Sequence, residues 1–142
     1  MINITIKEAY AYHEAIANYI KNVDEPVKGK AGFALRYNFR ILHNYLSEFI
    51  KKRDDIIKKY ADPIDDEDRK KYEEEGKSIP VVITKKENFD KANEEIKEFE
   101  DIELELPLLI ISIDEVMNSE GIDSNNADLF IWMTKEYRDS IK

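Results

Sequence analysis

The sequence predicts an α+β protein, in which a helical hairpin with one long helix (about residues 30–60) packs with a small sheet and two or three further helices. Apolar residues recur at steps of three and four through most of the first 60 residues, as in amphipathic helices. Alternating apolar residues near 2–6 and 102–106 are typical of half-buried strands. A chain of 142 residues has the length of one ordinary domain, so we expect a single domain over 1–142.

The N-terminal region predicts a strand that leads directly into a helix. Three isoleucines alternate with polar residues over 2–6 and indicate the strand. The helix is expected over about 7–21, where apolar residues follow helical spacing. Residues 24–26 end it with two acidic residues and a proline, and a connection that contains glycine follows over 27–32.

A long helix comes next, and its apolar stripe resembles the seam of a coiled coil. Because the connection is short, we expect the two helices to pair as an antiparallel hairpin. The second half of the long helix then extends beyond its neighbour and needs a further partner, either the C-terminal half of the chain or a second copy in a homo-oligomer. The stripe alternates steps of four and three, with Arg53 at its one non-apolar place, and consists of Leu35, Phe39, Leu42, Leu46, Phe49, Ile56 and Tyr60.

The second half of the chain begins with an acidic stretch. Residues 61–78 contain runs of charged residues with one proline and one glycine, and are expected to form an exposed acidic loop. A short strand is expected over 79–84, at a sheet edge because Pro80 lacks an N–H donor. A helix over 86–99 and an extended segment over 102–113 follow from their apolar patterns.

The C-terminal segment predicts two helices. Ser112, with Glu115 three residues later, forms a capping box for a short helix over 113–119. Gly121 separates it from a last helix, which is expected over about 125–141.

The composition excludes several kinds of site. The chain has no cysteine, which excludes disulfides, cysteine-ligated metals and thiolate nucleophiles. It has only four glycines and neither a Walker nor a dinucleotide-binding motif. The acidic run at 65–68 lacks the ligand spacing of an EF-hand. With no nucleophile turn and no singled-out carboxylate pair, we expect no catalytic residue, cofactor or metal, and no enzymatic activity.

The net charge of −9 is unevenly distributed. Residues 1–60 carry 11 basic and 7 acidic side chains, and residues 61–142 carry 11 basic and 24 acidic side chains. General nucleic-acid binding is not expected, since it requires a surplus of cations. The acidic half is either a solvated surface or a nucleic-acid mimic. We expect a cytoplasmic protein without a membrane segment, because the longest uncharged apolar run, 106–113, is too short to span a bilayer.

Positive groups gather near the start of the long helix. Lys28 and Lys30 lie at that start, and Arg36, Arg40 and His43 follow on one side at steps of three and four. Together with the free N–H groups of the helix start, they would attract an anion, whether a phosphate, a nucleotide or the carboxylates of a partner. The alternative is that Arg36 and Arg40 pair with carboxylates of the acidic half.

Two features of the first helix leave alternatives open. Tyr12 and Tyr19 lie seven residues apart on a face turned away from its main apolar side. They form either an exposed aromatic stripe for a partner or core contacts with the long helix. His13 lies among the regularly spaced apolar residues of the first helix. It is either a histidine at the edge of the core or a general base or metal ligand, and a metal site would need further ligand groups close to it.

The expected elements follow the order strand, helix, long helix, acidic insertion and extended segment. Three segments mark this order: VKGKAGFALRYN at 27–38, ELELP at 103–107 and ISIDE at 111–115. In that order and in those segments the chain resembles a family of small uncharacterised proteins from phages and prophages of low-GC Gram-positive bacteria. The resemblance covers most of the chain in its layout. It implies a viral origin and a location in the host cytoplasm, and it implies no catalytic residues.

These observations predict a non-enzymatic phage accessory protein that binds a host or phage macromolecule, for example to inhibit a host defence complex. One alternative is a binder of a small anionic, nucleotide-like ligand at the basic start of the long helix. Another is a helper of phage morphogenesis or assembly.

Overall fold

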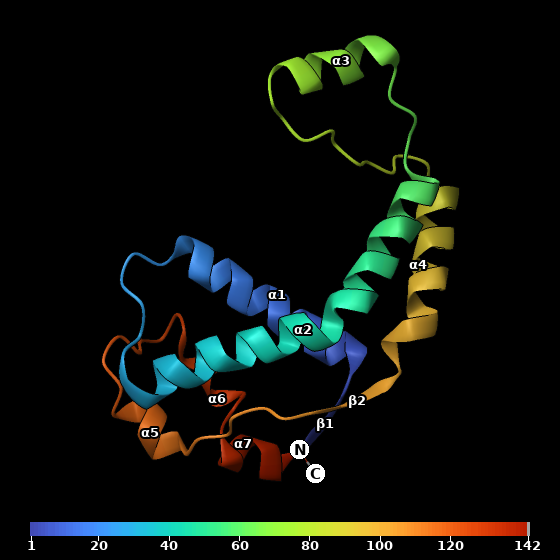
Figure 1. The fold of residues 1–142 in the computed structure, drawn as a ribbon. Helices are drawn as coiled ribbons and strands as arrows, with labels where there is room; N and C mark the ends of the chain where they lie inside the picture. The colour runs from blue at the N-terminus through green and yellow to red at the C-terminus, as the bar shows by residue number, and fades with distance from the viewer. Residues whose placement is uncertain (142) are drawn as a thin grey trace. The chain divides into compact units, whose positions relative to one another are not determined.

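The computed structural model describes residues 1–141 and confirms the α+β class with one long helix (Figure 1). Contacts divide the chain into two compact units, one formed by residues 1–47 with the segment that begins at Ile102, the other by residues 48–101. The long helix contributes its first part to one unit and its second part to the other. The elements are β1 (Ile2–Thr5), α1 (Ile6–Asn22), α2 (Gly29–Tyr60), α3 (Asp66–Glu74), α4 (Lys86–Glu100), β2 (Glu103–Leu106), α5 (Ile113–Met117), α6 (Ala127–Ile131) and α7 (Lys135–Ser140).

The small sheet consists of β1 and β2, which pair antiparallel with Ile2 opposite Leu106. Ile4 and Leu106 are buried, as the alternating pattern predicts. The step from strand to helix occurs at Thr5, whose side-chain oxygen accepts a hydrogen bond from the backbone N–H of Glu8. This N-cap satisfies one of the free donors of the first helical turn, and it explains why α1 begins directly after β1.

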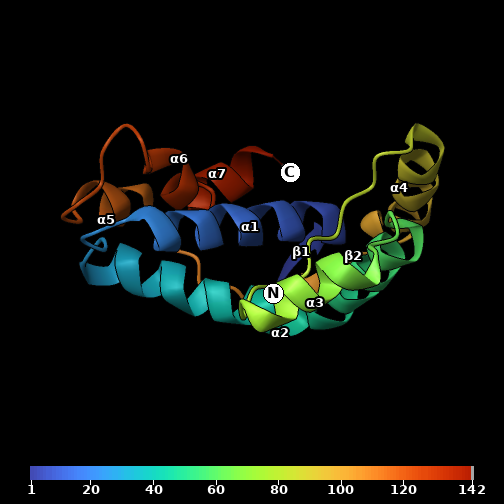
Figure 2. The same ribbon diagram turned by 90° about the horizontal axis from the view of Figure 1, so that it is seen from above.

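Helix α1 lies between the first part of α2 and the C-terminal helices (Figure 2). His13 faces α2, where its ring stacks on Phe39 with 4.9 Å between ring centroids. Tyr12, the neighbouring residue, faces the other way and stacks on Trp132 with centroids 3.7 Å apart. The antiparallel hairpin of α1 and α2 is thus covered on its α1 side, and the core of this unit includes Ile16, Leu35, Leu42, Leu46, Leu106, Val116, Phe130 and Met133.

The segment after β2 is held against α2 by a buried amide. Asn38 is fully buried, its side-chain nitrogen donates to the carbonyl of Leu109 at 2.9 Å, and its oxygen accepts from the N–H of Leu109 at 2.7 Å. Ile111 then forms a parallel bridge with Thr134. These backbone contacts explain why residues 107–112 remain extended without a strand partner over their whole length.

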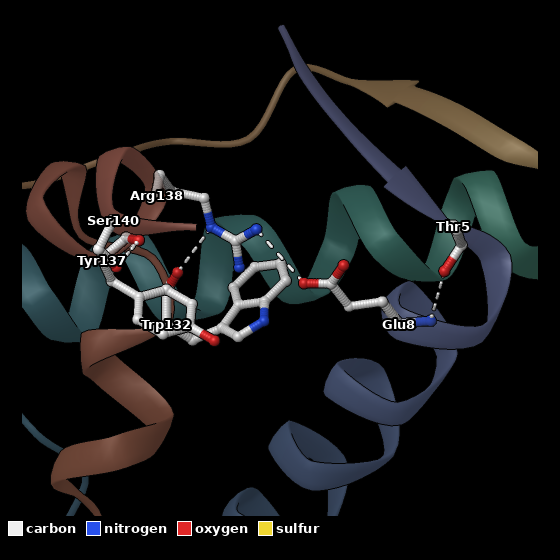
Figure 3. A network of polar contacts seen from close by, with 6 residues as sticks. All are labelled: Thr5, Glu8, Trp132, Tyr137, Arg138 and Ser140. Atoms are coloured by element: carbon white, nitrogen blue, oxygen red, sulfur yellow. Dashed lines mark hydrogen bonds and ion pairs between the residues drawn. The ribbon is translucent and has the colours of Figure 1, made fainter. Parts of the chain in front are cut away.

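A polar network joins α7 to α1 (Figure 3). Arg138 is buried, its Nε donates to the carbonyl of Trp132 at 2.9 Å, and its Nη1 donates to the carboxylate of Glu8 at 3.3 Å. The guanidinium carbon lies 3.7 Å from the centroid of the Trp132 ring. This contact is a cation–π interaction, which stabilises a buried arginine in addition to its hydrogen bonds.

In the second unit, α4 covers the apolar stripe of the second part of α2. Ile56 on α2 is buried, as are Ala92 and Ile96 on α4. Lys59 and Glu95 form an ion pair at 2.9 Å along the edge of this contact. The further partner that the sequence required for the long helix is therefore present within residues 48–101.

Three predicted boundaries are corrected. The acidic stretch is exposed as predicted, but it contains α3, because Asp65 accepts from the N–H of Asp68 and caps a helix whose first turn is acidic. Residues 79–84 belong to no strand, and the carbonyl of Val82 accepts a hydrogen bond from the N–H of Asp62. The last helix is divided at Thr134, whose hydroxyl caps α7.

Candidate functional site

Two neighbouring hollows of the first unit form the candidate site. An open depression of about 470 Å³, which we call the arginine groove, is lined by Ile20, Phe33, Arg36, Phe39 and Arg40. The second hollow, of about 250 Å³, is called the apolar pocket. Arg36 and Ile20 line both hollows, so the two hollows form one continuous candidate face, mainly on α1 and α2. The apolar pocket is lined by Tyr19, Ile20, Val23, Pro26, Val27, Gly32, Leu35, Arg36 and Phe130.

Arg36 and Arg40 are presented by the helical repeat of α2. Residues four apart lie one turn above each other on the same face of a helix, which brings both guanidinium groups to the groove. Both side chains are exposed, and no ion pair in residues 1–141 involves either of them. The internal pairing that the sequence offered as the alternative is therefore absent from the described part of the chain.

The groove also exposes large apolar side chains. Phe33 is 54% exposed and Ile20 is 43% exposed. Phe33 stacks on Tyr37, one helical turn further along α2, with 6.2 Å between the ring centroids. An aromatic ring held by its neighbour loses little side-chain entropy when a partner covers it, which is a property of residues that dominate protein interfaces.

Tyr19 contributes a polar group to the apolar pocket. Its ring is half-buried and lies edge-on to the buried ring of Phe130, with centroids 5.9 Å apart. Its hydroxyl is buried and has no hydrogen-bond partner in residues 1–141. A buried hydroxyl without a partner costs free energy, and an acceptor on a bound molecule would recover it.

The two lysines of the predicted cation cluster lie elsewhere. Lys28 and Lys30 line a separate depression of about 370 Å³ at the start of α2, together with Glu115, Ser119 and Glu120. The N–H of Lys28 donates to the carbonyl of Glu120. The lysines and the arginines therefore do not form one anion site, and the carboxylates beside the lysines lower the attraction of that depression for an anion.

Tyr12 is not part of an exposed stripe with Tyr19. It is 6% exposed, packs on Trp132, and donates from its hydroxyl to the carbonyl of Leu129. Of the two alternatives, Tyr12 is therefore a core residue and not an exposed one, but it packs on the C-terminal segment rather than on the long helix.

The burial of Tyr12 predicts a loss of stability in alkali. Desolvation raises the pKa of its phenol well above the ordinary value of 10, while the charge of Arg138 acts in the opposite direction. Because the folded state holds the neutral phenol, its contribution is fully present below pH 10 and is lost as pH rises toward the folded pKa. Urea unfolding followed by Trp132 fluorescence on both sides of pH 10 measures this loss. Tyr12→Phe should make it smaller; an unchanged pH dependence would contradict the assignment.

His43 is exposed on α2 and meets His13 of α1. The Nε2 atom of His13 lies 3.3 Å from the Nδ1 atom of His43, and the Nδ1 atom of His13 lies 3.2 Å from a carboxylate oxygen of Glu14. Across residues 1–141, no group of three or more His, Cys, Asp or Glu side chains is arranged to hold a metal ion.

Comparison with protein-family models, with curated proteins and with solved structures found no match to this chain. The site is therefore interpreted from its own geometry. Within residues 1–141, no helix has both the length and the apolar character needed to cross a membrane.

Three residues that the sequence singled out, Tyr19, Arg36 and Arg40, line the candidate face, whereas its apolar part was not predicted. Phe33, Arg36 and Arg40 follow one another at steps of three and four outside the buried stripe of α2. The sequence therefore contains a signal that could have found this face: an aromatic residue on the same side of the helix as two arginines, outside the buried stripe. Ile20, one of the apolar residues at helical spacing in the first helix, lines both hollows and is 43% exposed.

Proposed function

We propose that this protein acts without catalysis, by binding an acidic segment of a partner protein at the face formed by the arginine groove and the apolar pocket. The observation that carries the proposal is the position of Arg36 and Arg40 beside the exposed Phe33. Both arginines are exposed, and neither has an ion pair within residues 1–141. Arginine and aromatic residues are enriched among the residues that contribute most to protein interfaces.

The chemistry of the face defines the kind of partner segment that it fits. Guanidinium groups form paired, charge-assisted hydrogen bonds with carboxylates, so Arg36 and Arg40 favour acidic side chains. The apolar pocket, which Arg36 also lines, is suited to an apolar side chain of the same segment.

The proposal includes a phage origin for the protein and a location in the host cytoplasm. If the protein is the phage accessory protein that the sequence resemblance implies, its partner is a host or phage protein in the host cytoplasm, such as a component of a defence complex. The acidic groups that the face favours would then belong to that partner.

A small anionic ligand is the second candidate, because the same two unpaired guanidinium groups would bind a phosphate. A thermal-shift screen with nucleotides separates the candidates. A shift with one nucleotide that is lost in Arg40→Ala would favour the small ligand, and no shift with any nucleotide would count against it.

Affinity capture with matched variants tests the protein-binding proposal. The immobilised protein is exposed to a cell lysate, and the captured proteins are compared between Phe33→Ser and Phe89→Ser. Phe89 on α4 is a fair control because its exposure of 52% is close to the 54% of Phe33. We expect wild type and Phe89→Ser to capture the same partner protein. Phe33→Ser should bind that partner at least about tenfold more weakly, and the double variant Arg36→Glu/Arg40→Glu should not bind it. Equal capture by all four proteins, or no specific capture, would contradict the proposal.

A further inference from the structure

The chain has only two histidines, 30 residues apart in sequence, and the fold brings them together. His13 lies on α1 and His43 on α2, and their ring centroids are 5.4 Å apart. We propose that this pair is a binding site for a divalent transition metal ion of the zinc class, with the Nε2 atom of His13 and the Nδ1 atom of His43 as its two protein ligands. This proposal is independent of the protein-binding face.

The separation of the two nitrogens fits a single metal ion. Zinc binds imidazole nitrogen at 2.0–2.1 Å with tetrahedral angles, which places two nitrogen ligands about 3.3–3.4 Å apart. The observed distance between Nε2 of His13 and Nδ1 of His43 is 3.3 Å. The two rings can therefore ligate one ion with little movement of α1 against α2. Imidazole is also the ligand type that zinc, nickel and copper prefer over magnesium or calcium.

Glu14 supplies the support that a histidine ligand usually has. Its carboxylate lies 3.2 Å from Nδ1 of His13. A carboxylate at the remote nitrogen fixes the tautomer of a metal-binding histidine and raises the basicity of the ligating nitrogen. A carboxylate only accepts hydrogen bonds, so Nδ1 of His13 carries the proton and Nε2 keeps a free lone pair for the ion.

The same reasoning assigns the metal-free state of the pair. Because Nε2 of neutral His13 is an acceptor, the hydrogen bond between the rings must be donated by Nδ1 of His43. Binding of an ion requires that His43 changes to the Nε2–H tautomer, while His13 keeps its own. No net proton is released when both rings are neutral, because the proton of His43 moves from one ring nitrogen to the other through solvent.

The surroundings leave the site both rigid and open. His13 is 6% exposed and is held by its stacking on Phe39, whereas His43 is exposed. A tetrahedral ion bound by two histidines has two further positions, and these are filled by water or by groups of another molecule. Two protein ligands bind more weakly than the three or four of a typical zinc site, so we expect reversible binding and no dependence of folding on the metal.

Titration with zinc chloride, followed by the imidazole ¹H–¹⁵N NMR signals, tests the proposal. Because the chain has only two histidines, each signal can be assigned from one single variant. We expect both imidazoles to shift together and saturate at one zinc ion per chain, with His43 changing tautomer and His13 keeping its own. Magnesium chloride should leave both signals unchanged.

Three variants make the test specific. His43→Gln should weaken zinc binding by at least about tenfold, and Glu14→Gln by on the order of tenfold, because it removes the group that orients His13. Glu25→Gln, which removes an exposed carboxylate elsewhere, should bind zinc like the wild type. Unchanged imidazole signals, or equal zinc binding by His43→Gln and wild type, would overturn the proposal. Circular dichroism confirms that each variant is folded.

Discussion

Replacement of Asn38 by leucine is expected to lower the free energy of unfolding by about 2–4 kcal/mol, because two hydrogen bonds are lost at once. The amide of Asn38 is fully buried and satisfies both the carbonyl and the N–H of Leu109. Leucine has the same branching and the same number of side-chain heavy atoms but bulkier methyl groups, so it leaves no cavity, and the loss reports the unsatisfied backbone groups of Leu109 together with overpacking. Urea unfolding followed by the fluorescence of Trp132, the single tryptophan, measures the effect in the unit that contains Asn38.

A control on the same helix makes the Asn38 result specific. Asn44 is exposed, and Asn44→Leu should change the free energy of unfolding by less than about 0.5 kcal/mol. If the two leucine variants are equally stable, Asn38 does not hold the segment after β2 as described.

Gly32→Ala is expected to destabilise the same unit by about 3 kcal/mol, although alanine is normally the better residue within a helix. A Cβ atom at Gly32 would lie 1.9 Å from the carbonyl oxygen of Val27 and 2.7 Å from its carbonyl carbon. Both are backbone atoms of a buried residue, so the connection between α1 and α2 would have to move. The same urea unfolding experiment measures the loss.

An alanine substitution at an exposed position of α2 serves as the control for Gly32→Ala. Ser47→Ala introduces a better helix former at a position on the surface and should leave the stability within about 0.5 kcal/mol of the wild type. A Gly32→Ala variant as stable as Ser47→Ala would show that the close approach of Val27 does not exist in solution.

Local patterns were sufficient to predict the helices with regular apolar spacing. The long helix ends at Tyr60 as predicted, and Leu35, Leu42, Leu46, Phe49 and Ile56 of its stripe are buried. The stripe was predictable because the spacing of its apolar residues follows from the helical repeat alone. The N-cap at Ser112, half of the predicted capping box, was found for the same reason, since the Ser112 hydroxyl and the N–H of Glu115 that donates to it lie three residues apart.

Features that depend on distant parts of the chain were not predictable. Residues 79–84 have a strand pattern, but a strand requires a partner, and the described structure supplies none there. The exposure of Tyr12 and Tyr19 was decided by the C-terminal helices, which bury one of these residues and leave the other beside a pocket. The contact between the two histidines depends on the register of α1 against α2, which the sequence does not specify.

Only the local part of the candidate site, the position of its arginines on one helix, could be predicted from the sequence. Periodicity placed Arg36 and Arg40 on one side of the long helix, but it could not show whether carboxylates of the acidic half would reach them. In the described structure the ion pairs that carboxylates of that half form are with lysines, as Glu95 does with Lys59 and Glu87 with Lys91. The two arginines of the groove are thereby left for a partner in the proposal.

Site-specific photo-crosslinking tests the protein-binding face most directly. A photoreactive phenylalanine analogue is placed at Phe33 in one protein and at Phe89 in another, since the two side chains are almost equally exposed. Irradiation in cell lysate should yield one dominant adduct with a partner protein from position 33, none from position 89, and none from position 33 when Arg36→Glu and Arg40→Glu are also present. Adducts of equal yield from both positions, or from position 33 regardless of the arginines, would contradict the assignment of this face as the binding site.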